Sequence, residues 1–388
     1  MKETAGLRQI VTPQRDRIRF PHSIIDLLRH SSSTTTRIAI AATVFAWLPP
    51  AILAAIRGLS SLESFLADYA AQSRLLLVVP LLILTEPLLV LRLERIGRSF
   101  HHMGLISEAD MPRYSSVLTS FTGKRDTVVV RVVMLAAVYI FVASMMSVIR
   151  TSSLMAWCFG AGGVANLSPA GSWYVLASLP LVLYLILRWV WRQLLWLWFL
   201  SVTSRLDLQL VSSHPDKAGG LGFVEGCMRG YFPFGFAIGV IVAGAVGNRI
   251  VYLHQPLSAF RYLPLLVIAG LVVFCAGPLC PFWGILTRAR SQGIFQYGGL
   301  ANGVGRQFEE KWLPGNSTEL DGALAVPDFS ATADLYSIVA NVHDMNLFPV
   351  GMSSISRLAV AALAPAVPLA FIVLPFNVIM EHVLKLLF

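Results

Sequence analysis

Three ionisable side chains stand inside apolar stretches of the sequence, where charge is rare. Glu86 lies in LLILTEPLLV, and Arg188 and Arg192 lie four residues apart in another apolar stretch, with Tyr184 one turn earlier. This spacing puts the two arginines and the tyrosine on one helix face. A carboxylate in apolar surroundings requires a cationic partner. The sequence therefore predicts either a buried ion pair that fixes helix packing or a polar path for an ion, a proton or an anionic solute, and both interpretations stay open.

A second group of reactive side chains lies in the segment HPDKAGGLGF, residues 214–223. Its imidazole and carboxylate could join Asp207, Glu225 or His343 around a cation. Two donors without a defined third fall short of a metal site, so whether a metal binds is left open. We favour a turn that Pro215 stiffens and an aspartate caps. Under either interpretation the loop residues of interest are His214, Asp216, Lys217, Gly219, Gly220 and Gly222.

The tripeptide HPD also marks co-chaperone J-domains, but this segment lacks the room for one. Residues 201–230 are enclosed by two apolar stretches. The three glycines that follow the motif also oppose a regular helix, at about 1 kcal/mol each. A J-domain is therefore excluded.

The composition shows which elements must position these groups. Hydrophobic residues make up 56% of the chain, charged residues only 13%, and the mean hydropathy is +0.68. A bilayer requires about 20 apolar residues per helix, and continuous rather than alternating apolar runs favour helices over barrel strands. We predict an all-α polytopic transmembrane bundle with about seven spans and amphipathic cytoplasmic helices. The predicted spans are Ile38–Ile56, Leu75–Leu91, Val128–Ile149, Trp173–Leu200, Tyr231–Gly247, Tyr262–Leu286 and Leu358–Met380.

The distribution of Lys and Arg predicts the orientation of the bundle. Basic residues crowd the segment before the first span and the loop after the second, and basic loops stay in the cytoplasm. The N-terminus is therefore expected inside and the C-terminus outside. The chain divides into a basic cytoplasmic segment 1–37, six spans over 38–286 with the HPDKAGGLGF loop at 201–230, a cytoplasmic loop 287–357, and a last span with a short tail, 358–388.

This topology allows the charged groups inside the membrane to meet. Counting helix rise from the predicted outer ends of the spans puts Glu86 about 16 Å deep and Arg188 about 22 Å deep. We therefore predict contact between the two side chains.

Two further patterns concern packing. The fifth span carries small residues at intervals of four, a pattern that lets helices approach closely within a bundle, at a subunit interface or along a sliding seam. They are Gly235, Gly239, Ala243 and Gly247. In the cytoplasmic loop, residues 330–345 have apolar side chains at helical spacing. This amphipathic helix has three possible partners: the protein's own loops, the membrane surface or another protein.

The chain resembles an uncharacterised family of bacterial multi-pass inner-membrane proteins. The likeness rests on the HPDKAGGLGF loop, TEPLL around Glu86, FQYGGLA at 295–301, KWL at 311–313, ATADL at 331–335 and LFP at 347–349. It covers most of the chain from about Leu27 onward. The resemblance implies a bacterial inner-membrane location and a polytopic architecture, and it implies no reaction.

Three classes of function remain after these observations. Transport or permeation of an ion or small solute ranks first, and a non-catalytic membrane scaffold or sensor subunit second. An enzyme ranks last, because no nucleophile elbow, HExxH, Walker loop or redox pair is present. We expect no cofactor and no nucleic acid, because anionic lipid explains the basic loops and the net charge of +9. A homo-oligomer or a partner subunit is possible.

Overall fold

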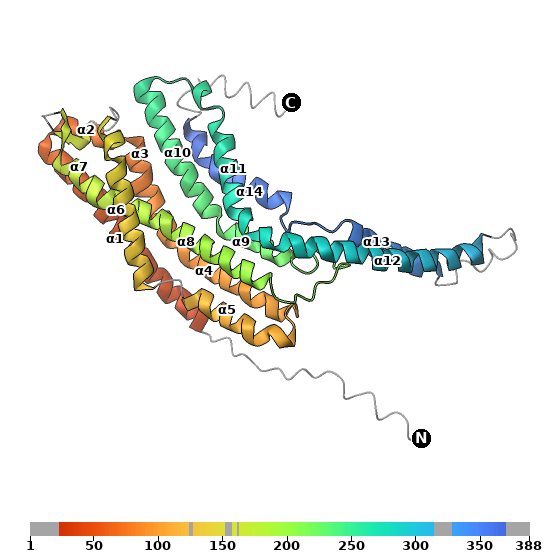
Figure 1. Ribbon diagram of the computed structural model, residues 1–388. Coiled ribbons are helices and arrows are strands. Elements are labelled where there is room, and N and C mark those ends of the chain that lie inside the picture. Colours follow the sequence, from red (N-terminus) through yellow and green to blue (C-terminus); the bar gives the residue numbers. More distant parts are fainter. Residues whose placement is uncertain (1–22, 124–126, 152–156, 161–162, 314–327, 370–388) are drawn as a thin grey trace.

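The computed structural model describes residues 23–123, 127–151, 157–160, 163–313 and 328–369, which are almost entirely helical (Figure 1). Seven helical stretches in these residues are long and apolar enough to cross a membrane, which confirms the predicted all-α bundle. They are Ser33–Arg57, Tyr69–His102, Val128–Met146, Pro169–Thr203, Gly222–Leu253, Leu257–Trp312 and Met352–Leu369.

Four long helices form one part of the bundle: α1 (Ser23–Arg57), α4 (Val79–His102), α6 (Val128–Thr151) and α8 (Leu179–Thr203). The short α3 (Tyr69–Gln72) and α7 (Pro169–Trp173) lead into α4 and α8 through π-helical turns at Ser73–Val78 and Tyr174–Ser178. Beside them lie α2 (Leu59–Leu66) and a small hairpin of β1 (Phe159–Gly160) and β2 (Gly163–Leu167). We call this end of the bundle the α7 end. The opposite end, which holds α5 (Met111–Gly123), is the α5 end.

Three helices pack side by side in the second part of the bundle: α10 (Phe232–Leu253), α11 (Leu263–Ala276) and α14 (Met352–Leu363) (Figure 1). The short α9 (Gly226–Gly230) precedes α10 and packs against α4. A 3-10 stretch, Gly277–Phe282, follows α11; it contains Pro278 and Pro281, which cannot donate the backbone hydrogen bonds of a regular helix.

An arm of two paired helices projects away from the bundle in Figure 1. Its first helix is α12 (Trp283–Trp312) and its second is α13 (Asp328–His343). Phe308 and Trp312 on α12 pack against Phe329 on α13, with ring centroids 4.8 and 5.1 Å apart. RQFEEKWL, residues 306–313, predicts only a short amphipathic helix, whereas α12 has 30 residues. Pro314, Gly315 and Asn316 predict a turn after it, which lies outside the described residues.

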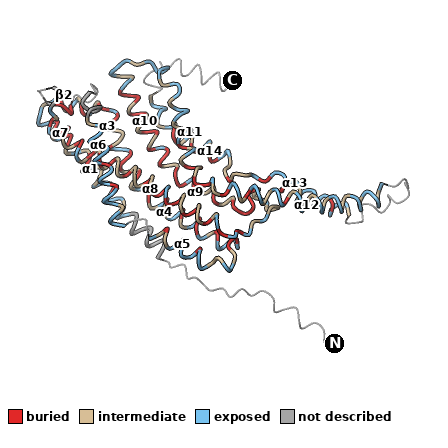
Figure 2. The backbone as a smooth tube through the Cα atoms, in the orientation of Figure 1, coloured by how far each residue is buried: buried red, intermediate tan, exposed pale blue. Residues whose placement is uncertain are grey.

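The buried core follows α4, α8 and α10. In the most apolar windows of the α8 and α10 spans 44% of residues are buried, against 17% for the α6 span, so α6 lies at the periphery (Figure 2). Aromatic side chains fill the core at the α5 end, where rings from α4, α5 and α8 meet. These are Phe100, Tyr114, Phe121, Trp196 and Phe199.

The helices extend beyond the predicted spans. The second runs from Tyr69 to His102 rather than from Leu75 to Leu91, and the fourth begins at Pro169 rather than Trp173. At the α5 end, where these helices continue to His102 and Thr203, aromatic side chains of α4, α5 and α8 pack together. Helix α1 likewise begins at Ser23, within the predicted basic segment. The last predicted span is described only as far as Leu369.

Candidate functional site

The candidate site lies where α4 and α8 pack together (Figure 1). Glu86 is followed in α4 by Pro87, which removes one backbone hydrogen bond inside the helix. Close to this break, the Trp189 indole N–H donates to the Leu82 carbonyl at 3.3 Å, and the Thr85 hydroxyl donates to the Leu81 carbonyl at 2.6 Å. The contact from Trp189 holds α8 against α4 beside this break.

Both arginines on α8 contact the Glu86 carboxylate on α4. Arg188 Nη2 lies 2.7 Å from Glu86 Oε1, and Arg192 donates to the same oxygen through Nε at 2.7 Å and through Nη2. The Arg188 guanidinium also lies over the Tyr184 ring, 5.9 Å from its centroid. All four residues of the predicted polar group therefore come together. We call Glu86, Arg188 and Arg192 the charged centre.

The charged centre is buried and carries more positive than negative charge. Glu86 and Arg192 are each only 7% exposed. Arg192 Nη1 has no hydrogen-bond partner among the described residues, and neither do Gln193 Oε1 and the Tyr231 hydroxyl, which are also buried. Buried polar atoms are normally hydrogen-bonded. The centre therefore retains one unused donor on Arg192, and the nearby Gln193 and Tyr231 side chains retain an acceptor and a hydroxyl.

The centre lies near the middle of both helices. Counting about 1.5 Å per residue from Tyr69 and Pro169, where the two helical spans begin, places Glu86 about 26 Å and Arg188 about 28 Å along their helices from the α7 end. The helices continue to His102 and Thr203 at the α5 end. The depth of the centre in the membrane stays a prediction.

A further arginine, which the sequence did not single out, joins this region. Arg131, in the first turn of α6, lines a narrow cleft together with Tyr184, Arg188 and Arg192. The cleft has about the volume that holds one water molecule. Arg131 was missed because its place beside α8 depends on how α6 packs, which the spacing of residues in α6 does not reveal.

The HPDKAGGLGF loop folds around the Asp216 carboxylate. Oδ1 accepts the backbone N–H groups of Ala218 at 2.9 Å and Gly220 at 3.1 Å, and Oδ2 accepts that of Gly222 at 2.8 Å. His214 Nδ1 lies 2.8 Å from Oδ1. Partial burial alone raises the pKa of Asp216, but these hydrogen bonds together lower the pKa below its ordinary value.

The glycines allow the backbone to make this turn. Gly219 and Gly220 have φ of +64° and +94°, which side chains disfavour. A Cβ at Gly222 would lie 3.0 Å from Asp216 Oδ2. Lys217 also adopts a positive φ, +53°, and its Nζ lies 2.8 Å from Asp344 Oδ2, just after α13. The loop therefore connects the bundle to the arm.

The structure does not gather the expected cation ligands around the loop. Within the described ranges no group of three or more His, Cys, Asp or Glu side chains is placed to hold a metal ion. The Asp207 carboxylate instead accepts the Gln209 amide at 3.3 Å, and Glu225 lies beside Gly351. The His343 carbonyl accepts from Arg290 at 2.7 Å.

The small residues of the fifth span face α14. A Cβ added to Gly239 would lie 2.0 Å from the Ala362 carbonyl oxygen, and one added to Gly235 would lie 3.0 Å from Leu358. Gly247 approaches Leu369 in the same way, and Ala243 is buried. The close approach that the stripe predicts is therefore made within this chain.

A second buried acid, Asp68, lies at the α7 end. It is 2% exposed and accepts from the Ala71 backbone N–H at 2.9 Å, the Trp157 indole at 3.0 Å and the Asn248 amide at 2.8 Å. From the sequence alone, Asp68 is one of two acids in a loop that also holds Arg57 and Arg74, so nothing in the charge pattern distinguishes it. Its position just before α3, typical of a helix cap, was the available signal.

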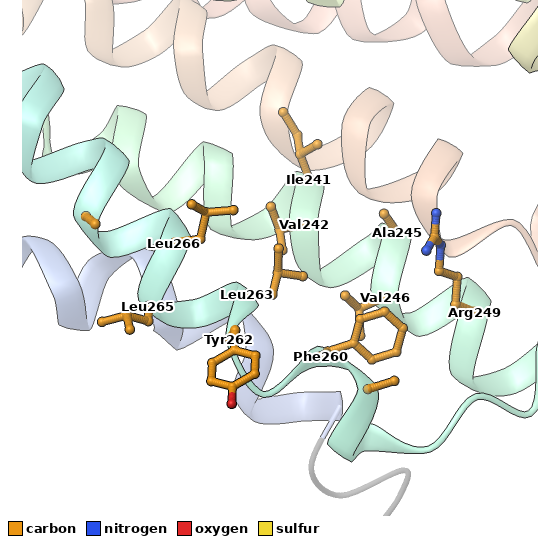
Figure 3. A pocket seen from close by; sticks show the side chains of 12 residues that line it. Ile241, Val242, Ala245, Val246, Arg249, Phe260, Tyr262, Leu263, Leu265 and Leu266 are labelled. Atoms are coloured by element: carbon orange, nitrogen blue, oxygen red, sulfur yellow. The ribbon is translucent and has the colours of Figure 1, made fainter.

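A large groove lies between α10 and α11 and measures about 820 Å³ (Figure 3). Its lining is apolar apart from Arg249 and the Tyr262 hydroxyl, and includes Ile241, Val246 and Leu266. The groove offers apolar contact and is separate from the charged centre.

Comparisons of the chain with protein-family models, with curated proteins and with solved structures found no match. The seven apolar helices nevertheless identify the chain as an integral membrane protein of the multi-pass type.

Proposed function

We propose that the protein transports an ion or a small solute, or lets one permeate, and that the charged centre forms part of the path. The supporting observation is the centre itself: Glu86 and Arg192 are buried within helices that span the membrane, and two arginines share one carboxylate. Charged groups in such positions are expensive, and they commonly line ion or substrate paths.

We place the α5 end in the cytoplasm of a bacterial inner membrane, with the N-terminus inside, and we assign the chain to the uncharacterised family that its motifs resemble. The basic residues of the loop between α4 and α6 support this orientation. Anionic lipid at this surface would be their partner.

Flux across liposomes tests the transport proposal. The full chain, reconstituted in lipid vesicles, should carry a current or take up radiolabelled chloride, phosphate or a small carboxylate, and Glu86→Gln should change the rate. Glu63→Gln, which alters an exposed acid at the α7 end, is the matched control. Rates equal to those of protein-free vesicles, for every solute and for current, would contradict transport.

The arm favours a second candidate function, a membrane scaffold. On the arm, Phe295 is 80% exposed, and Leu300 and Tyr336 are also exposed. These apolar side chains have no cover from the described helices of the bundle. The predicted amphipathic face of α13 is mostly used within the chain, because Val342 and Met345 are buried and Leu335 and Val339 are half-buried. A partner would therefore contact the exposed residues instead.

Site-specific crosslinking distinguishes the scaffold from the transporter. A photoreactive residue at position 295 should yield one defined adduct in intact membranes, and Tyr336→Asp should abolish it. The same photoreactive residue at position 265, in place of the exposed Leu265 on α11, is the control. Adducts with lipid alone would rule out the scaffold.

A further inference from the structure

The cleft between α6 and α8 is lined by cationic groups. Arg131, Arg188 and Arg192 contribute three guanidinium groups, and the remaining lining residues, Val130, Met134, Tyr184 and Trp191, carry no carboxylate. Glu86 contacts two of these arginines from the α4 side. Glu94, another acid on α4, lines a separate narrow cleft beside Arg192 and lies 3.9 Å from Arg98. Three arginines thus line the cleft, and two of them contact one carboxylate.

One of the arginines that line the cleft has an unused hydrogen-bond donor. Arg192 is only 7% exposed, and its Nη1 has no hydrogen-bond partner among the described residues. The Arg188 side chain is 32% exposed, and Arg131 is exposed. Arginine forks match the oxygens of phosphate and carboxylate groups, and such charge-assisted hydrogen bonds are stronger than neutral ones.

We propose that this cleft is a binding site for a phosphate-type oxyanion, held by Arg131, Arg188 and Arg192. One oxygen enters the cleft toward Arg192, which suits its small volume, and the rest of the group stays at the mouth between Arg131 and Arg188. This inference rests on the proposed function, because it names the class of solute for the same centre.

The position of the cleft allows two sources for the oxyanion. Val128, Val129, Val132 and Val133 surround Arg131 in sequence and are between 60 and 72% exposed, as expected for a lipid-facing surface. Because Arg131 is exposed and the Arg188 side chain is 32% exposed at the mouth of the cleft, a phospholipid phosphate and a soluble phosphate ion are both candidates. The chemistry of binding is the same for both.

Binding measurements on the full chain separate these sources. The detergent-purified protein is titrated with inorganic phosphate in one arm and with phosphatidylglycerol in the other, with phosphatidylcholine as the neutral lipid. Arg131→Gln should weaken binding of the accepted probe about tenfold or more, since it removes one charge-assisted hydrogen bond. Because Arg131 is exposed, this variant should fold. Arg95→Gln, an exposed arginine on α4, is the control and should bind like the wild type.

Each outcome has a defined meaning. If Arg131→Gln loses only phosphatidylglycerol binding, a lipid headgroup is the source of the oxyanion. If it loses the binding of inorganic phosphate, the free ion is the source. Equal affinity of the wild type and Arg131→Gln for both probes, or no binding of either, would overturn the site. Binding that depends on Arg131, without any flux in vesicles, would refute transport and leave the oxyanion site intact. Flux that depends on Glu86, without binding that depends on Arg131, would support transport and refute the oxyanion site.

Discussion

The charged centre and the HPDKAGGLGF loop use their acids in opposite ways. In the loop, three backbone N–H groups and His214 surround the Asp216 carboxylate, so its hydrogen-bonding capacity is used in holding the turn. In the centre, one carboxylate serves two arginines and a buried guanidinium nitrogen is left over. A distinctive sequence motif can therefore be structural, while an ordinary helix face can retain hydrogen-bond donors for a ligand.

Loss of the carboxylate from the centre should have the largest effect on stability. Glu86→Leu leaves two guanidinium groups without their acid, and breaking a buried ion pair from one side costs about 3–5 kcal/mol. Thermal unfolding in detergent should show this loss. Glu63→Leu, at an exposed position, should stay within about 0.5 kcal/mol of the wild type. If Glu86→Leu lowered the unfolding free energy only slightly, the Glu86 carboxylate would not be neutralising the two arginines.

A packing change comes next. Gly239→Ala places a methyl group 2.0 Å from the Ala362 carbonyl oxygen, so α10 and α14 must move apart. Overpacking of this kind costs about 1–3 kcal/mol. Gly270→Ala on α11 is the control, since a Cβ there meets nothing within 4 Å. Equal unfolding temperatures for the two variants would argue against close contact between α10 and α14.

The loop should respond to removal of its acid and to pH. Asp216→Asn turns an amide nitrogen or a weaker oxygen toward backbone N–H groups, and should cost about 1–3 kcal/mol. Asp207→Asn, in the same loop, should be nearly neutral, because that side chain is exposed.

The sign of the pH effect follows from the lowered pKa of Asp216. The ionised carboxylate stabilises the folded state above the unfolded pKa of about 3.9, and this contribution is lost as pH falls through the lower folded pKa. The stability difference between the wild type and Asp216→Asn should therefore be constant at neutral pH and shrink below about pH 4. A difference that grew in acid would contradict the hydrogen-bonded carboxylate.

The smallest effect belongs to the contact between the loop and the arm. Lys217 and Asp344 are 42 and 62% exposed, and an exposed ion pair adds little to stability because water and salt screen it. The hydrogen bond and charge of Lys217 lower the pKa of Asp344. Asn tolerates the positive φ of Lys217, so Lys217→Asn removes the charge without backbone strain. Hydrogen exchange of residues 340–346 should rise slightly, and equally in Asp344→Asn.

Hydropathy was sufficient to predict the seven spans, because lipid requires long apolar helices. The helical spacing of Arg188 and Arg192 also predicted their shared face. Two features depended on tertiary packing instead. Arg131 reaches the cleft only through the position of α6, and α12 stays helical across several glycines partly because α13 packs on it, with the Tyr336 hydroxyl 2.9 Å from the Cβ position of Gly305.

A double-mutant cycle between α4 and α8 tests the central claim, that Glu86 and Arg192 are energetically paired inside the bundle. Unfolding free energies of the wild type, Glu86→Gln, Arg192→Gln and the double variant would be measured in one detergent. The contact predicts a coupling energy of about 1–3 kcal/mol, with the double variant less damaged than the sum of the single ones. Additivity within about 0.5 kcal/mol would contradict the pairing.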